Sequence, residues 1–156
     1  MSSPATSPIP TPGISVQERN KAVTWAFFDE VFNKGNMSVV SKLGPNYKFN
    51  GSSQNNNGFI GWVQKLRSTY PDMQVTFLSN IAEGNAVAIR WQMTGTHPGT
   101  NGSYGWSVEA TGNNLLTYDE EGQCLTNDQA GTCTRVADGI ATTHDSSQIL
   151  DLLLAP

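Results

Sequence analysis

Charged residues are scarce in this sequence, which has 9 Lys and Arg and 13 Asp and Glu among 156 residues. They make up 14% of the chain, whereas ordinary globular domains carry roughly 25%. With so few basic residues and a net charge of −4, the chain lacks the basic surface that binds the phosphates of nucleic acids. We therefore expect no nucleic-acid partner.

Long apolar runs are also missing, since no stretch approaches the roughly 18–20 consecutive apolar residues of a membrane-spanning helix. We therefore expect no membrane partner. Apolar residues still make up 37% of the chain, with 4 Trp, 6 Phe and 4 Tyr. That content is enough for a packed core and excludes a wholly disordered chain.

The first fifteen residues contain no charge and four of the eight prolines. Proline fixes φ and lacks a backbone donor, and nothing in this stretch alternates or repeats. We expect a flexible Pro/Ser/Thr-rich tail at 1–15, followed by one domain at 16–156, because a chain of this length is normally a single domain. The tail has no basic start and no apolar centre, so it does not match a secretory signal peptide.

Cysteine is nearly absent, with Cys124 and Cys133 as the two examples. They flank a polar stretch with Gly131 that we interpret as the tip of a hairpin. Two cysteines across a hairpin can reach disulfide geometry, which would indicate an oxidising compartment. The alternative is two unrelated free thiols. Neither histidine is close in sequence and no Cys-x-x-Cys pair occurs, so we expect no metal site.

Apolar residues at spacings of three and four predict helices at 16–32, 38–43 and 59–70. Ser15 and Glu18 form a capping-box pattern at the start of the first. From residue 73 the period changes to two, which is typical of strands. The expected strands are 47–50, 73–78, 87–94, 106–111, 114–119, 133–137 and 140–145. An apolar segment at 146–154 is expected to form a final helical turn.

Helices that precede a series of hairpins are typical of the α+β class. We expect a curved antiparallel sheet wrapped around three N-terminal helices to form a cone, a cystatin-like α+β barrel. The open mouth of such a cone is where one small-molecule pocket would lie.

Several stretches match a known family in order and spacing. They are FFDEVFNKGNMSVVSKL, GFIGWVQKLRSTYPDMQV, EGNAVAIRWQMTGTHPG, Ala-Thr-Gly at 110–112, and VADGIATTHD with ILDLLL. Together they cover roughly residues 16–154, and the chain resembles the SnoaL-like polyketide cyclase branch of the nuclear transport factor 2-like superfamily. Asn50 departs from the family pattern, which usually has His there, and Asp138-Gly139-Ile140 lacks the usual Arg.

The resemblance implies a cofactor-independent cyclase or isomerase that closes a ring in a polyketide-like or terpenoid-like small molecule. An aldol-type closure needs a base to remove a proton beside a carbonyl and a donor to stabilise the enolate. The superfamily also contains catalytically silent modules, since fold does not fix function. The alternative is therefore a non-catalytic small-ligand-binding or dimerisation module.

Three residues are candidates for the catalytic groups. The family's cyclases carry an Asp on or after the last strand, which Asp145 matches, and we favour it as the base. His144 precedes it, and neighbours on a regular strand point to opposite faces, so only one of the two can face the pocket. The alternative is that Asp145 caps the final helix. His97 is a candidate oxyanion donor or proton relay, or else a surface histidine bonded to the backbone.

Five residues are candidates for substrate binding: Tyr47, Asn50, Trp62, Arg90 and Gln92. Tyr47 and Asn50 lie on or near the first strand, and Trp62 belongs to a group of helix aromatics that can stack on a planar ring. Arg90 and Gln92 are either polar pocket walls or exposed residues of the sheet. Gln92 stands where the epoxide hydrolase branch has a carboxylate, which disfavours that reaction.

If Arg90 and Gln92 face the pocket, a row of large apolar side chains faces outward: Val87, Ile89, Trp91 and Met93. Such a row does not stay in water, so it is either the core face or an interface. The superfamily often dimerises through the outer sheet face, and we expect a homodimer. The resemblance implies a cytoplasmic protein, whereas a Cys124–Cys133 disulfide would imply a secreted one.

Overall fold

The computed structural model describes residues 14–99 and 105–146, with side chains described as far as residue 143 in the second range. The expected tail at 1–15 and the expected final turn at 146–154 fall almost wholly outside these ranges. Within them, no helix is long and apolar enough to cross a membrane.

The N-terminal part of the described chain is mostly helical. Its helices are α1 (Val16–Phe28), the π-helical turn η1 (Asp29–Asn33), the 3₁₀ helix η2 (Met37–Lys42) and α2 (Asn56–Thr69). The expected capping of the first helix is confirmed, since the Ser15 hydroxyl accepts from the Glu18 N–H at 3.1 Å. Side chains of Asn36 and Asn55 cap η2 and α2 in the same way.

The first helix ends in a π turn, and Asn33 at the end of that turn bonds to the edge of the sheet. Its amide accepts from the Val75 N–H at 2.7 Å and donates to the Val75 carbonyl at 3.0 Å. These two bonds satisfy backbone groups on an edge strand, and the wider π turn is the local adjustment that accompanies them.

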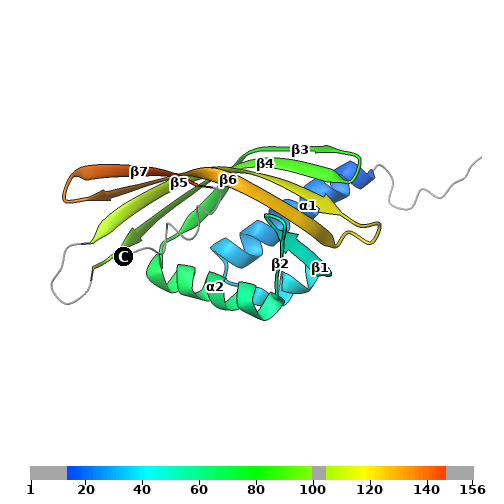
Figure 1. Cartoon of the computed structure of the whole chain (residues 1–156), viewed down its shortest axis with the longest axis horizontal. Coiled ribbons are helices and arrows are strands. Elements are labelled where there is room, and N and C mark those ends of the chain that lie inside the picture. The colour runs from blue at the N-terminus through cyan, green and yellow to red at the C-terminus, as the bar shows by residue number, and fades with distance from the viewer. Residues whose placement is uncertain (1–13, 100–104, 147–156) are drawn as a thin grey trace, which may run out of the picture.

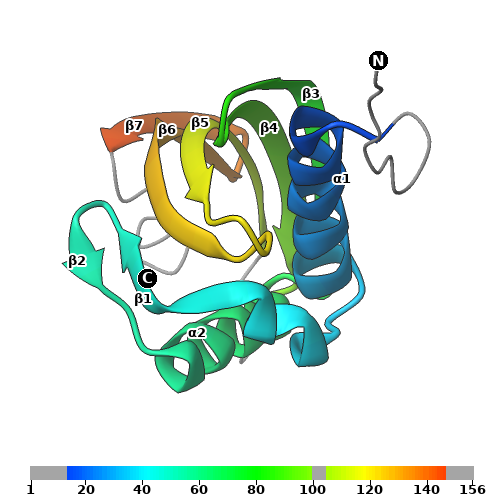
Figure 2. The ribbon, with the colours of Figure 1, turned by 90° about the vertical axis from the view of Figure 1, so that its right-hand side faces the viewer.

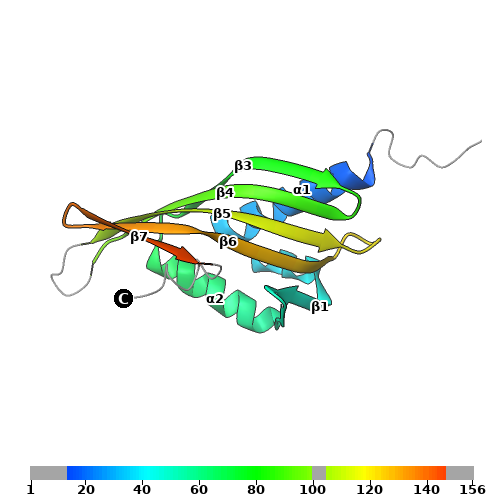
Figure 3. The ribbon, with the colours of Figure 1, turned by 45° about the horizontal axis from the view of Figure 1, so that its top comes forward.

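The strands form one mixed sheet in the order β2-β1-β6-β5-β4-β3, and β7 also pairs with β6. They are β1 (Leu43–Phe49), β2 (Ser52–Ser53), β3 (Gln74–Glu83), β4 (Ala86–His97), β5 (Trp106–Tyr118), β6 (Cys124–Ala137) and β7 (Ile140–Ser146). The sheet is not wholly antiparallel as expected, because β1 runs parallel to β6. β1 pairs with the first part of β6 and β7 with the second (Figure 3).

The sheet curves over the helices, which is the expected α+β cone (Figure 1). In Figure 2 it curls around one side of the molecule, with α1 against β3 and β4 and α2 below. The two strands expected at 106–111 and 114–119 are one continuous strand, β5. No break occurs between residues 111 and 114, since β5 passes through Gly112 and pairs there with Trp91.

The interpretation of Cys124 and Cys133 as flanking a hairpin tip is wrong. Both lie on the single strand β6, and the turn comes before it, between β5 and β6. Nine residues of strand separate the two by roughly 30 Å, far beyond disulfide reach. Both are buried free thiols. The prediction was wrong because amide side chains face inward on this strand, so apolar and polar residues do not alternate along it in the usual way.

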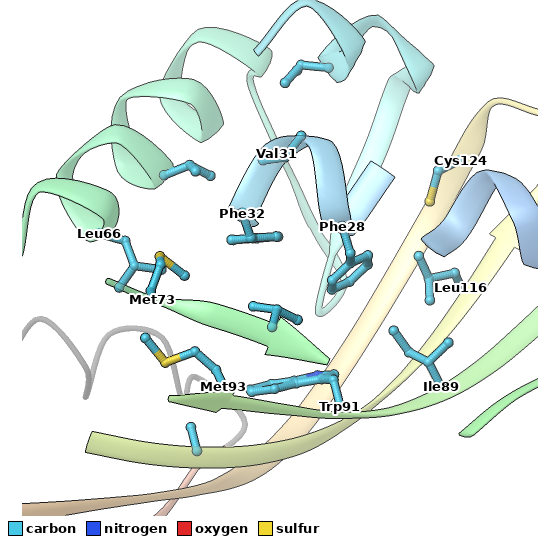
Figure 4. Close-up of a cluster of buried hydrophobic side chains, with 14 of the residues drawn as sticks. Phe28, Val31, Phe32, Leu66, Met73, Ile89, Trp91, Met93, Leu116 and Cys124 are labelled. Atoms are coloured by element: carbon cyan, nitrogen blue, oxygen red, sulfur yellow. The ribbon is translucent and has the colours of Figure 1, made fainter. Parts of the chain in front are cut away.

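The row Val87, Ile89, Trp91 and Met93 is the core face of β4, with no member more than 3% exposed. Figure 4 shows Ile89, Trp91 and Met93 on the side of the sheet that faces Phe28, Phe32 and Leu66 of the helical layer. Of the two alternatives considered for this row, the structure therefore shows the core face. A homodimer through the outer, convex face of the sheet stays a prediction.

Candidate ligand-binding cavity

A cavity of about 410 Å³ lies between the helices and the concave face of the sheet. Its walls come from α1, β1, the start of α2, the last part of β5 and the first part of β6. Pockets that hold small molecules measure roughly 300–1,000 Å³, so this cavity has the size for one compact ligand.

One wall is aromatic and is built by the helices. It consists of Phe27, Phe28, Phe32, Phe59 and Trp62. The rings interlock, with centroids 5.9 Å apart for Phe27 and Phe59, and 6.2 Å apart for Phe32 and Trp62. Rings that brace one another keep their positions when the cavity is empty, so the wall presents a preformed apolar surface.

The facing wall carries a chain of buried hydrogen bonds across four strands. The Trp91 indole N–H donates to Asn114 Oδ1 at 2.7 Å, and Asn114 Nδ2 donates to Asn127 Oδ1 at 2.7 Å. The side chain of Asn127 then hydrogen-bonds Tyr47 on β1. Asn114, Asn127 and Tyr47 line the cavity, whereas Trp91 supports them from the core.

Burial controls the ionisation of the phenols and the thiol in this wall. Desolvation raises the pKa of Tyr47 and of Tyr118 well above the usual value for a tyrosine. It also raises the pKa of the Cys124 thiol to about 12. All three groups are therefore neutral at pH 7, and Cys124 is not an activated nucleophile.

Tyr118 is held from the helical side. Its hydroxyl bonds to the Thr24 hydroxyl, and Thr24 donates to the backbone carbonyl of Asn20 at 2.7 Å. This pair ties α1 to β5 across the cavity, and both Thr24 and Tyr118 line it.

Asn50 and Gln129 lie where β1 ends against β6. Asn50 has a φ of +49°, and its side-chain oxygen accepts from the Gln129 N–H at 2.7 Å. Gln129 is 6% exposed, and its side-chain oxygen has no hydrogen-bond partner within the described structure. Both residues line the cavity.

Lys42 is the one charged side chain among the described residues that line the cavity. Those residues include no Asp, Glu or His. Elsewhere too, the described ranges contain no cluster of three side chains of the kinds that bind metals. The lining therefore suits a neutral ligand, held by shape and by uncharged hydrogen bonds.

Three of the five expected substrate-binding residues come together here, namely Tyr47, Asn50 and Trp62. Arg90 and Gln92 do not, and this corrects their placement. Because their neighbours on β4 fill the core, both project from the convex face, where Gln92 donates to Glu109 at 3.0 Å.

His97 lies at the end of β4, outside the lining of the cavity. Its ring stacks on Trp106 with centroids 3.9 Å apart, and its Nδ1 accepts from the Gly99 N–H at 2.9 Å. This is the alternative considered above, a loop histidine bonded to the backbone. His97 is therefore not part of the described walls of the cavity.

Asp145 and His144 lie on β7, which confirms the expected strand. In the backbone register, Asp145 pairs with Thr132 and His144 with Cys133. Thr132 bonds to Thr111 across the convex face, whereas Cys133 is buried in the core. The side chains of Asp145 and His144 lie outside the described part of the chain, so their catalytic roles stay predictions.

The polar side chains that β5 and β6 contribute to the site were not expected; they are Asn114, Tyr118, Asn127 and Gln129. The sequence of β6 does contain a signal for this site, because the amides Asn127 and Gln129 alternate with Asp128 and Ala130. Polar residues on both faces made that stretch look like a loop. Amides in a buried strand mark a polar site when each has a partner, but the partners come from other strands and are not visible in the sequence.

A curved sheet closed over helices around a cavity defines the class, an α+β cone fold of the nuclear transport factor 2-like type. Within it, the family model for SnoaL-like polyketide cyclases matches residues 22–123, and the chain belongs to that family. The match includes the second half of α1 and all of β1, α2 and β5, which supply most of the cavity. A search of curated proteins found no match.

Solved structures share the fold at low sequence identity. A candidate polyketide cyclase from Acidithiobacillus ferrooxidans is 22% identical, with a TM-score of 0.62 over 76% of this chain and 91% of the other. The candidate cyclase IdmH from Streptomyces antibioticus is 21% identical, with a TM-score of 0.59 over 86% and 97%. The candidate hydroxylase AclR from Streptomyces galilaeus is 20% identical, with a TM-score of 0.61 over 75% and 80%.

Proposed function

We propose that the cavity binds a neutral, polyketide-like small molecule with a planar ring system and a few oxygen substituents. The observation that carries this proposal is the pairing of an aromatic wall with a wall of buried amides and phenols around about 410 Å³. An apolar surface with a few placed polar groups is the usual composition of a small-molecule site.

The absence of carboxylates and imidazoles from the described lining narrows the ligand further. A cationic ligand would lose its hydration in this cavity without meeting a negative charge. An anionic ligand would meet one positive charge in the described lining, that of Lys42. A neutral ring system loses little on entering and gains contact with the interlocked aromatic side chains. Ketones and phenols of polyketide origin fit this description.

The binding proposal is tested by filling the cavity. Gly58 lines the cavity from the start of α2, whereas Gly61, three residues further along, does not. A Cβ built at Gly61 meets nothing within 4 Å. Calorimetric titration with fluorenone, a flat neutral ketone, should give binding to the wild type and to Gly61→Trp, and a loss of at least about tenfold in Gly58→Trp.

Equal binding by the two tryptophan variants would contradict the proposal, because the cavity would then not be the binding site. Circular dichroism and thermal unfolding of both variants show whether either change has altered the fold. Since both glycines are exposed on the same helix, each variant carries the same chemical change.

A second proposal concerns catalysis, and family membership supports it. We propose that the chain closes a ring in its ligand by an aldol-type reaction, with Asp145 or His144 as the base. A base takes a proton from the carbon beside one carbonyl, that carbon bonds to the second carbonyl carbon, and water is lost from the product. A polarised carbonyl next to a hydrogen-bond donor favours the step.

The catalytic proposal is tested with a phenylacetone that carries an ortho-acetyl group, which closes to a methylnaphthol with loss of one water. Turnover by the wild type should fall by about a hundredfold or more in the variant that removes the base, Asp145→Asn or His144→Gln. If fluorenone binds but the wild type closes no ring above the uncatalysed rate, the chain is a binding module and the catalytic proposal fails. If the wild type turns over and neither substitution changes the rate, the roles of Asp145 and His144 fail.

A further inference from the structure

The direction of the hydrogen-bond chain in the cavity wall is fixed at one end. The Trp91 indole nitrogen can donate but not accept, so Asn114 must turn its oxygen toward Trp91. That orientation leaves the Asn114 nitrogen to donate to Asn127 Oδ1 at 2.7 Å. Asn127 then has its nitrogen left for Tyr47, the next member of the chain. One indole N–H therefore sets the polarity of both amides.

Tyr47 ends this chain inside the cavity. Its phenol oxygen accepts from Asn127, so its own proton must point elsewhere, and the residue lines the cavity. Burial raises the pKa of Tyr47, which keeps that proton in place at neutral and mildly alkaline pH. The phenol is therefore held as a hydrogen-bond donor.

Tyr118 has the opposite polarity, although it lines the same cavity. Thr24 has one hydroxyl proton and donates it to the backbone carbonyl of Asn20 at 2.7 Å. The hydrogen bond between Thr24 and Tyr118 must then be donated by Tyr118. Its proton is used, and only lone pairs remain for a ligand. The two phenols of the cavity therefore offer different groups.

We infer that Tyr47 determines specificity by donating a hydrogen bond to a carbonyl oxygen of the ligand, and that Trp91, Asn114 and Asn127 are positioning residues that hold it as a donor. This inference rests on the proposed binding function, because it assigns one bond within the same cavity. It names the ligand class as neutral ring ketones. If the ligand also undergoes ring closure, the same bond stabilises the negative charge that develops on that oxygen.

The test compares two ligands of the same shape, fluorenone and fluorene, which differ by one carbonyl oxygen. The wild type should bind fluorenone about fivefold more tightly than fluorene, the gain expected from one neutral hydrogen bond in a protein. Tyr47→Phe should reduce this preference to less than about twofold. Tyr118→Phe is the matched control, since the same atom is removed from the same cavity, and it should keep the preference.

The infrared carbonyl band of bound fluorenone reports the hydrogen bond directly. In the wild type and in Tyr118→Phe the band should lie at lower frequency than in hexane, and in Tyr47→Phe it should return toward the hexane position. Trp91→Phe removes the donor that orients both amides, so the band should move part of the way back. If Trp91→Phe weakens the binding of both ligands equally and leaves the band unmoved, Trp91 has a packing role only. That result would overturn the positioning role of Trp91.

The remaining outcomes distinguish a failure of this inference from a failure of the binding proposal. Equal affinity of the wild type for fluorenone and fluorene, or a band in Tyr47→Phe that still lies at the wild-type position, would overturn the role of Tyr47 while binding stands. Failure of the wild type to bind either molecule would overturn the proposed function and this inference with it.

Discussion

The ring of Trp91 on β4 lies against Gly112, its partner on β5, closely enough that no side chain fits between them. A Cβ built at Gly112 would lie 2.6 Å from Trp91 Cε2. The glycine therefore lets the indole lie over the neighbouring strand. In that position its N–H reaches Asn114 and starts the hydrogen-bond chain of the cavity wall.

Gly112→Ala should therefore destabilise the protein by about 1–3 kcal/mol, the usual cost of adding a group to a packed core. Chemical denaturation in urea measures the change. Gly61→Ala is the control, because that position is open and alanine favours a helix over glycine by about 1 kcal/mol. A Gly112→Ala variant as stable as the wild type would show that Trp91 can move aside without cost.

Asn50 combines a left-handed backbone conformation with a hydrogen bond to the Gln129 N–H. Asn50→Gly keeps the backbone freedom and loses the bond, so it should cost about 1 kcal/mol. Asn50→Ala loses both and should cost about 1–2 kcal/mol more, since alanine is strained at positive φ. Urea denaturation of the two variants separates the contributions. Equal stability of the two would contradict the backbone argument.

The buried phenols and the Cys124 thiol make stability sensitive to alkaline pH. Their pKa values are raised in the folded state, so the folded chain holds protons that the unfolded chain releases. The free energy of unfolding should therefore fall as pH rises above about 9, where an unfolded cysteine and then tyrosines ionise. Tyr118→Phe should flatten this fall, as measured by urea denaturation between pH 7 and pH 11. An equally steep fall in that variant would contradict this assignment.

Both cysteines should be unreactive in the folded protein, because they are buried and have raised pKa values. Titration with a disulfide reagent under native conditions should detect almost no thiol, and titration in denaturant should detect two. An intact mass two hydrogens below the reduced mass, in protein that unfolds cooperatively, would instead indicate a Cys124–Cys133 disulfide and contradict the placement of both on β6.

The helices and most strands of this chain could be predicted from sequence because their apolar residues repeat at regular spacings. The apolar row on β4 is an example, and the capping pattern of Ser15 and Glu18 marked the start of the first helix in addition. The interior of the cone was harder to predict, since Asn127 and Gln129 face inward on β6 where apolar residues are usual. Their burial depends on partners from β5 and β1, and such contacts between strands leave no local pattern.

Two side chains of β4 were also predicted to point to the wrong face of the sheet. Arg90 and Gln92 were expected in the pocket because polar groups are needed there, yet the polar groups come from the inward side of β5 and β6. The apolar row opposite them was the better guide, since large apolar side chains pack inward whenever a helical layer is available to cover them.

The central claim is that a neutral ring ketone binds between the aromatic wall and the polar wall of the cavity. The most direct measurement is the set of intermolecular nuclear Overhauser effects between fluorenone and the protein side chains. The account predicts contacts from the ligand to Phe59 and Trp62 on one wall and to Leu116 on the other. Contacts confined to Leu115 on the convex face, or to Trp106 beside His97, would contradict it.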